Sequence, residues 1–223
     1  MSASENIAIV KNNIKEAAKK SGREKGQISL VAVSKTFPAE IIKTVQQSGH
    51  NLFGESYVQE FLKKQEKIPE INWNFIGQLQ SNKVKYIVNK ISLLHSLDRK
   101  SLADELSKRY SEQNLTIDVL VQVNIGNEIQ KGGVEPEKLY EFIDYAAALS
   151  AVKIKGLMCI HPFEEPEECR KYFVRMNKLF QNAKDRGYPM EQLSMGMSAD
   201  YTQAIEEGST MVRVGSAIFG HRI

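Results

Sequence analysis

Lys35 is the residue best placed for covalent chemistry, because it closes the apolar run ISLVAVSK (28–35). A lysine held beside an apolar wall has its ammonium form disfavoured, so a neutral, nucleophilic amine becomes available. Such an amine can form a Schiff base with an aldehyde. A lysine at the end of a strand can also extend its charged group into water, and on this position alone that is the simpler interpretation.

The segment TMVRVGSAIFG (210–220) has the composition of a phosphate site. Gly215 lets backbone amides approach phosphate oxygens, and a short helix beginning near Ser216 would add a favourable partial charge. Arg213 lies two residues before Gly215, so both positions share one face of a strand, and an arginine on an interior face needs a partner. The simpler alternatives are a tight turn at Gly215 and Ser216 and an exterior ion pair for Arg213.

The segment SMGMS (194–198) adds two hydroxyl groups, Ser194 and Ser198, with Gly196 between them. It ends the apolar run that precedes the Arg213 segment, so both segments belong to neighbouring units of the chain. In barrels of alternating strands and helices, phosphate is often bound by the loops after strands seven and eight. The coincidence of the two segments therefore favours a phosphate site over separate structural explanations.

Other candidates for chemistry are weaker. His161 follows an apolar run and could act as an acid or base, but a lone histidine at the start of a loop is more often structural. Glu55 and Asp200 could be paired carboxylates, but capping or salt bridging explains them as well. The four histidines are scattered and the two cysteines, Cys159 and Cys169, are distant from each other, so we expect no metal site.

These residues follow apolar runs that alternate with amphipathic segments from residue 28 onward. Strict alternation predicts a parallel sheet, and eight units favour a closed (β/α)8 TIM barrel over an open sheet. Active sites in such barrels lie at the carboxyl ends of the strands, which is where Lys35, Gly196 and Gly215 fall. The expected strands are 28–35, 51–55, 72–77, 92–98, 117–124, 153–160, 192–197 and 211–216, and the expected helices 39–48, 56–67, 79–90, 99–113, 136–149, 166–186 and 199–207.

Composition restricts the class of protein. The 223 residues carry 30 Lys and Arg against 27 Asp and Glu, which gives no reason to expect nucleic-acid binding. Two cysteines predict no disulfide framework and agree with a reducing cytoplasm. The first twenty residues contain no long apolar run and are expected to form an extra amphipathic helix, not a signal peptide or membrane span. We expect one domain over 1–223.

The chain resembles the pyridoxal phosphate homeostasis proteins over essentially its whole length. The resemblance lies in LVAVSKTFP, LFGESYVQE, NFIGQLQSNK and the long closing block MGMSADYTQAIEEGSTMVRVGSAIFGHR. It implies a monomeric barrel of the fold type III of pyridoxal 5′-phosphate (PLP) proteins, similar to the N-terminal domain of alanine racemase.

The resemblance also implies roles for individual residues. Lys35 matches the lysine that forms the aldimine with PLP. Ser194 and the backbone of Gly215 and Ser216 would hold the phosphate. Arg213 matches the arginine that faces the pyridine nitrogen and keeps it unprotonated, which weakens the cofactor as an electron sink.

Some positions depart from the pattern of the family or remain unassigned. Gly196 is included in the expected cofactor-binding set through its place in SMGMS. Ser56, Gln78 and His161 differ from the residues that many family members carry, so the sequence predicts no role for them. The irregular stretch 126–136 is expected to form the loop after the fifth strand.

The expected function is to hold PLP for storage, protection or delivery to PLP-requiring apoenzymes, without catalysis. The sequence runs to Ile223 directly after the eighth unit, so we expect no second domain of the racemase type. Two alternatives stay open. One is a small PLP-dependent racemase or decarboxylase that uses His161 or Tyr57 as a second acid or base. The other is a sugar-phosphate enzyme that uses Lys35 on a carbonyl substrate.

Overall fold

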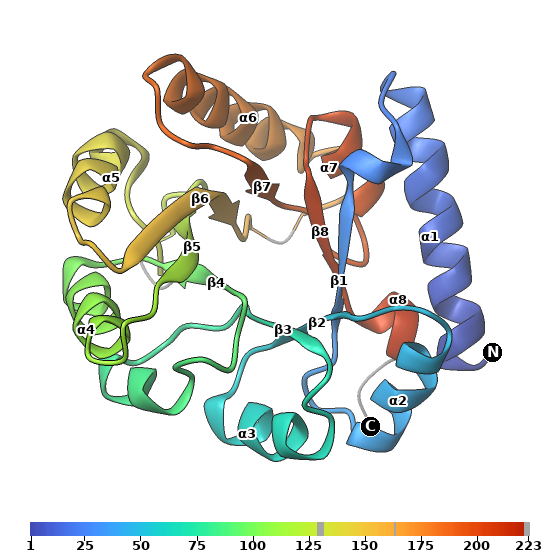
Figure 1. Cartoon of the computed structure of the whole chain (residues 1–223). Helices are drawn as coiled ribbons and strands as arrows, with labels where there is room; N and C mark the ends of the chain where they lie inside the picture. The colour runs from blue at the N-terminus through green and yellow to red at the C-terminus, as the bar shows by residue number, and fades with distance from the viewer. Residues whose placement is uncertain (129–131, 163, 221–223) are drawn as a thin grey trace.

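Eight parallel strands form a closed barrel, as the alternation of the sequence predicts (Figure 1). The computed structural model describes residues 1–128, 132–162 and 164–220, so part of the predicted 126–136 loop lies outside the described residues. The barrel closes where the first strand pairs in parallel with the eighth, with Ala32 opposite Val214. The strands are β1 (Ser29–Val33), β2 (Leu52–Glu55), β3 (Asn72–Phe75), β4 (Leu93–Leu97), β5 (Ile117–Val123), β6 (Val152–Cys159), β7 (Gln192–Ser194) and β8 (Met211–Val214).

Helices connect and cover the strands. Three helices are followed by glycines with positive φ angles, Gly49, Gly187 and Gly208, a conformation that commonly ends a helix. None of the helices in the described ranges is long and apolar enough to cross a membrane. The α-helices are α1 (Ala3–Lys20), α2 (Ala39–Gln47), α3 (Val58–Lys67), α4 (Lys100–Ser111), α5 (Leu139–Ala147), α6 (Arg170–Asp185), α7 (Tyr201–Glu206) and α8 (Ser216–Phe219), and the 3₁₀ helices are η1 (Lys25–Gln27), η2 (Ser81–Tyr86) and η3 (Pro136–Lys138).

One predicted helix was wrong. The segment 79–90 contains the 3₁₀ helix η2 in place of an α-helix, and its backbone bonds from Lys83 to Gln80 and from Ile87 to Val84 span three residues. The next helix begins at Lys100 after Arg99 and has no side-chain cap. The carboxylate of Asp98, just before it, accepts from Arg99 Nη1 at 2.6 Å.

The barrel interior consists of an apolar layer below a polar one. Val31, Leu93, Leu120, Met158 and Met211 form one buried cluster inside the strands. Because side chains alternate along a strand, the residues two positions after Leu93 and Met211 also point inward. They are His95 and Arg213, and both are buried. The polar layer therefore lies nearer the carboxyl ends of the strands, beneath the mouth of the barrel.

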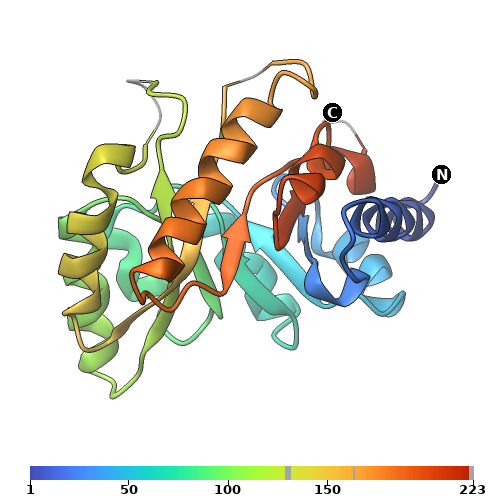
Figure 2. The same ribbon diagram turned by 90° about the horizontal axis from the view of Figure 1, so that it is seen from above.

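The outside of the β1–β8 closure is covered by α1, the extra N-terminal helix that the sequence predicts. This helix packs against α2, α7 and α8 (Figure 1), and its buried face consists of Ile7, Val10, Ile14, Ala17 and Ala18. In Figure 2, α8 lies at the edge toward which the arrows of β5 and β7 point, which is the mouth.

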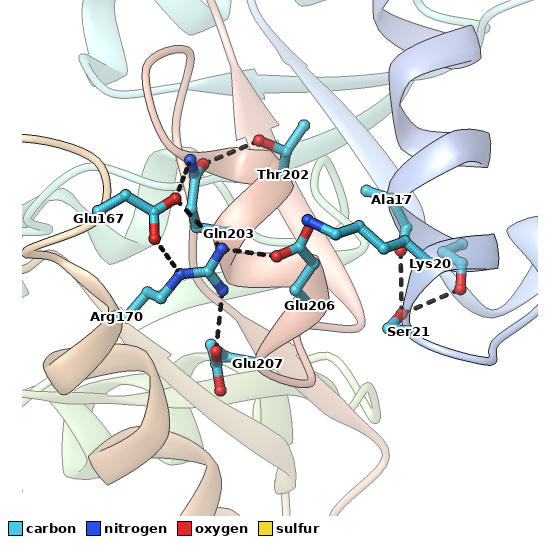
Figure 3. Close-up of polar contacts among 10 residues, drawn as sticks. Ala17, Lys20, Ser21, Glu167, Arg170, Thr202, Gln203, Glu206 and Glu207 are labelled. Carbon is cyan, nitrogen blue, oxygen red and sulfur yellow. Dashed lines mark hydrogen bonds and ion pairs between the residues drawn. The ribbon is translucent and has the colours of Figure 1, made fainter.

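An ionic network ties the neighbouring helices together. Figure 3 shows Arg170 of α6 between three carboxylates, with Nη2 to Glu206 at 2.6 Å and Nη1 to Glu207 at 2.9 Å. Lys20 of α1 reaches Glu206 at 2.7 Å. These pairs join α1, α6 and α7 on the outer surface, so the last units of the barrel are fixed relative to the first.

Candidate functional site

A cavity of about 570 Å³ opens at the mouth of the barrel, beside the closure of β1 against β8. Lys35 follows β1, and Gly215 and Ser216 follow β8, so the parallel pairing of the two strands brings these residues to one wall. Arg213 also lines the cavity. The remaining walls are apolar or small and comprise Val33, Phe37, Ile76, Ile160, Met197 and Ala199, with the hydroxyls of Ser56 and Ser198 among them.

Arg213 points into the barrel and is only 5% exposed. Its Nη1 donates to Ser194 Oγ at 2.6 Å and its Nη2 to the carbonyl of Cys159 at 2.8 Å. Burial lowers the pKa of the guanidinium below its ordinary value. In the described part of the chain no carboxylate lies within ion-pair distance of this group, so Arg213 offers a positive charge to the cavity.

Ser194 belongs to the polar layer and does not line the cavity. Its hydroxyl oxygen lies 2.6 Å from Arg213 Nη1 and 3.2 Å from His95 Nδ1. On the far side of the ring, Asn74 Nδ2 lies 3.0 Å from His95 Nε2. Burial, together with the charge of Arg213, holds the pKa of His95 well below its usual value, so the ring is neutral.

An arginine only donates, so Ser194 Oγ accepts from Arg213 Nη1. The direction of the bonds that His95 makes with Ser194 and Asn74 follows from the tautomer of its ring. We infer that Ser194 holds the guanidinium in place, where the resemblance assigned it to phosphate.

Ser198, four residues later, lies at the cavity. Its Oγ accepts from the amide of Gly215 at 3.1 Å and from that of Ala217 at 3.3 Å. Two backbone amides thus converge on one oxygen at the start of α8, as they would on an oxygen of an anion. Gly196 lies between the two serines with φ +94°, and a Cβ there would approach Ala204 Cβ to 2.5 Å. Only glycine lets the chain pass this close to α7.

Lys35 is directed inward by its neighbours, which are anchored outside the barrel. Ser34 is fully buried and donates from Oγ to Glu55 Oε1 at 2.6 Å. Lys64 of α3 donates to the carbonyl of Ser34 at 2.8 Å and to the same Glu55 oxygen at 2.6 Å. With residue 34 held against α3, strand alternation turns residue 35 toward the interior.

The residue after Lys35 is held as well. Thr36 has φ +73°, an unusual conformation for a residue with a branched side chain. Its amide donates to Glu60 Oε1, which also accepts from Lys64 Nζ at 2.7 Å. Lys64, Glu55 and Glu60 therefore fix the backbone on both sides of Lys35. This anchor could not be predicted from the sequence, because Lys64 lies 30 residues from Ser34. In the sequence, Lys64 is simply one of several charged residues of an amphipathic helix.

Lys35 also borders a second cavity of about 470 Å³, whose lining does not include Arg213. Ser56, Tyr57, Gln78 and Gln122 line it. Ser56 and Gln78, for which the sequence predicted no role, therefore face the space next to the lysine. Gln122 was missed, although its place near the end of the fifth strand could have identified it.

The other candidate residues lie away from these cavities. His161 is 4% exposed, and its Nε2 lies 3.1 Å from Asp200 Oδ2. Its Nδ1 faces the carbonyl of Pro162 at 2.6 Å. Glu55 lies under α3 and Asp200 beside His161, so the two carboxylates do not form a pair.

The residues at the mouth fit a small anionic aldehyde. Gly215, Ser216 and Ser198 provide amide and hydroxyl donors for an anionic group, Lys35 provides an amine, and Arg213 provides a buried cation. Val33, Ile160 and Met197 provide apolar surfaces against which a flat ring can pack.

Comparisons with known proteins find relatives over nearly the whole chain. The family model of the alanine racemase N-terminal domain matches residues 6–223. The pyridoxal phosphate homeostasis protein of Aquifex aeolicus is 46% identical, over 100% of this chain and 99% of that protein. The protein of the same name from Escherichia coli K12 is 39% identical, over 97% of this chain and 95% of its own length.

Solved structures show the same fold. PipY of Synechococcus elongatus, whose structure has PLP bound, is 31% identical with a TM-score of 0.81, covering 93% of this chain and all of PipY. The alanine racemase of Clostridium difficile is 16% identical with a TM-score of 0.76. This chain spans 57% of that racemase, and the likeness concerns the fold alone.

We predict that Lys64→Met destabilises the protein by about 3–5 kcal/mol near neutral pH, because it leaves the Glu55 carboxylate buried without its cation. Burial raises the pKa of Glu55 above its ordinary value, while the charge of Lys64 opposes that rise. Without Lys64 the folded-state pKa is higher still, so the folded state binds a proton that the unfolded state has lost. Stability of the variant therefore falls as pH rises through this window.

Urea unfolding at mildly acidic and at neutral pH measures this effect, with a larger loss at neutral pH expected. Lys67→Met is the matched control, because Lys67 lies on the same helix with its side chain 62% exposed. An equal loss from Lys64→Met at both pH values would contradict the assignment of the penalty to Glu55.

Proposed function

Because the chain belongs to the family of pyridoxal phosphate homeostasis proteins, we propose that it binds PLP and takes part in PLP homeostasis, by storing, protecting or delivering the cofactor. The observation that carries this proposal is the meeting of Lys35, Arg213 and the Gly215–Ser216 turn at one cavity. The PLP-bound structure of the relative PipY supports it.

In this proposal Lys35 holds the cofactor covalently, as a Schiff base between Nζ and the aldehyde carbon. The support is the position of the side chain, which borders both cavities at the mouth. The anchor formed by Lys64, Glu55 and Glu60 keeps the backbone of residues 34–36 in one conformation. The backbone at Lys35 then loses little conformational freedom when the amine reacts.

The phosphate group would take the place at the start of α8 that faces Ser198. The amides of Gly215 and Ala217 converge there, and Ser198 adds a hydroxyl that can rotate to donate. Ser216 lines the same part of the cavity. Gly196 contributes indirectly, since its close contact with α7 determines where Ser198 emerges from the chain.

Arg213 would face the pyridine nitrogen from below. A charged guanidinium donates but cannot accept, so it binds the nitrogen lone pair and keeps that nitrogen unprotonated. The guanidinium of Arg213 donates to Ser194, whose hydroxyl also contacts His95. These contacts restrict rotation of the guanidinium out of the cavity. A PLP bound in this way is a poor electron sink, which favours retention of the cofactor over turnover.

We propose that the protein is not an enzyme and acts as a cytoplasmic monomer that supplies PLP to apoenzymes. The names of its relatives describe homeostasis and not catalysis. Both ring nitrogens of His161 face protein acceptors away from the cavity, so this residue is not positioned as a second base. Two free, buried cysteines fit a reducing compartment. In this proposal residues 1–223 act as one PLP-binding domain.

We predict that Lys35→Ala abolishes the covalent linkage while weak binding through the phosphate group remains. Wild-type protein incubated with PLP should show the visible absorbance of the linked cofactor, and borohydride reduction followed by peptide mass spectrometry should find the adduct on Lys35. Lys83→Ala, at the neighbouring groove near Gln78, should behave as wild type. A colourless wild-type protein would favour a sugar-phosphate enzyme, and an adduct retained in Lys35→Ala would refute the assignment.

We predict that Arg213→Gln weakens PLP retention by about 10- to 150-fold, because a hydrogen bond to a charged group contributes roughly 1.5–3 kcal/mol. Glutamine can still donate to Ser194 or to the Cys159 carbonyl, so the fold should persist. Equilibrium dialysis of wild type, the variant and Arg109→Gln on α4 measures the effect. Equal cofactor occupancy in all three proteins would rule out a role for Arg213.

We predict that the protein accelerates α-proton exchange of amino acids no more than free PLP does. The test is incubation with L- and D-amino acids in deuterated water, followed by mass spectrometry. Tyr57, 57% exposed at the mouth, is the remaining candidate for a second base. Fast exchange that Tyr57→Phe abolishes would instead establish a small racemase.

A further inference from the structure

His161, Cys169 and Asp200 form a buried cluster that the proposed cofactor function does not use. They come from three elements: His161 follows β6, Cys169 is the N-cap residue of α6, and Asp200 is the N-cap residue of α7. Their exposed fractions are 4%, 0% and 4%. One nitrogen, one sulfur and one oxygen, all able to ligate a metal, lie within 4.8 Å of one another.

Hydrogen bonds orient His161 and Asp200 toward each other, while the thiol of Cys169 donates to the carbonyl of Glu164 at 3.5 Å. The carbonyl of Pro162 only accepts, so His161 Nδ1 must carry a hydrogen and donate to it at 2.6 Å. This leaves Nε2 directed at Asp200 Oδ2, 3.1 Å away. The other oxygen of Asp200 accepts from the amide of Met197 at 2.7 Å. A backbone partner for the remote ring nitrogen and for the second carboxylate oxygen is the arrangement that supports metal ligands in proteins.

The facing pair also requires a positive charge between its members. A neutral imidazole that donates from Nδ1 presents a lone pair at Nε2, and a carboxylate presents lone pairs as well. Two lone pairs at 3.1 Å repel unless a proton or a metal ion lies between them. The thiol of Cys169 lies close to both atoms and offers a third ligand. A metal ion would use this ligand, whereas a proton shared between His161 and Asp200 would not.

We propose that His161, Cys169 and Asp200 bind a divalent metal ion of the zinc class. Nitrogen, sulfur and a single carboxylate suit zinc and not magnesium or calcium, which take sets of oxygen ligands. Zinc ligands lie about 2.0–2.3 Å from the metal, so small movements of the three side chains would complete the site. Three protein ligands leave a fourth position for water.

This site is separate from the PLP cavity but joined to it through the chain. Ile160 precedes His161, and Ser198 and Ala199 precede Asp200; all three line the PLP cavity. A bound metal would fasten the end of β6 to the loop before α7, and with it two walls of the mouth. The proposal goes beyond the proposed function and does not depend on it, since its ligands contact no cofactor.

Sequence analysis missed the site because its residues are far apart along the chain and only one cysteine takes part. The second cysteine, Cys159, lies on β6 in another environment, where burial raises the pKa of its thiol to about 12. This residue provides a matched control, because it is also buried and free.

The test is titration of the PLP-free protein with Co²⁺, followed by displacement with Zn²⁺. Wild type and Cys159→Ser should bind one ion per chain, with visible bands of tetrahedral cobalt and a near-ultraviolet band from cobalt–thiolate charge transfer. Cys169→Ser should lose the thiolate band, and His161→Gln and Asp200→Asn should bind at least tenfold more weakly. Because the ligands are buried, each sample is equilibrated until its spectrum is constant.

Absence of stoichiometric cobalt binding by folded wild type would overturn the proposal, and so would a thiolate band that persists in Cys169→Ser or disappears in Cys159→Ser. Circular dichroism identifies variants that fail to fold. For these, native mass spectrometry of wild type with Zn²⁺, with and without alkylation of Cys169, decides instead. Zinc bound equally to the alkylated protein would overturn the site. Since no PLP is present, failure here leaves the PLP proposal standing, and failure of PLP binding leaves this result unaffected.

Discussion

The parallel pairing of β1 with β8 is the interaction on which the site depends. It closes the barrel, and it brings the residue after the first strand beside the turn after the last, although Lys35 and Gly215 lie near opposite ends of the sequence. Neither strand end could build the site alone, since one contributes the amine and the other the amide donors. The helix α1 and the ion pairs of Arg170 and Lys20 cover the outside of this closure. These ion pairs thus help to hold the first and last parts of the chain side by side.

The barrel wall separates two networks that act on neighbouring residues. Outside it, Lys64 and Glu55 hold Ser34; inside it, His95 and Ser194 hold Arg213. Both networks bury charge, which is costly unless every partner is satisfied. The outer network neutralises its charge with carboxylates, whereas the inner one surrounds a cation with neutral acceptors. The interior therefore keeps the positive charge of Arg213, which attracts an anionic ligand at the mouth.

The sequence predicted those features that depend on local pattern. Alternating apolar runs and amphipathic segments were sufficient for the closed barrel. They left open whether Arg213 lies inside the barrel or in an exterior ion pair, and the structure buries it inside. The predicted and observed elements differ where one or two residues decide the outcome. Segment 79–90 contains the 3₁₀ helix η2 in place of an α-helix, and β7 ends at Ser194, so that Ser198 lies beyond the strand and lines the cavity. The roles of Lys64 and of Cys169 rest on contacts between distant segments, which a single sequence does not reveal.

Under the proposed function the protein must hold PLP firmly and still release it. Lys35, which follows β1, and Arg213, on β8, are positioned by buried networks. Another part of the cavity wall comes from the segments around Ile160 and Ser198, which follow β6 and β7 outside any strand. Under that function, the strength of retention would depend on how closely these two segments approach the ligand. His161 and Asp200 join the two segments of that wall. A metal ion bound between these two residues, as proposed above, would therefore act on this part of the wall without disturbing the strands.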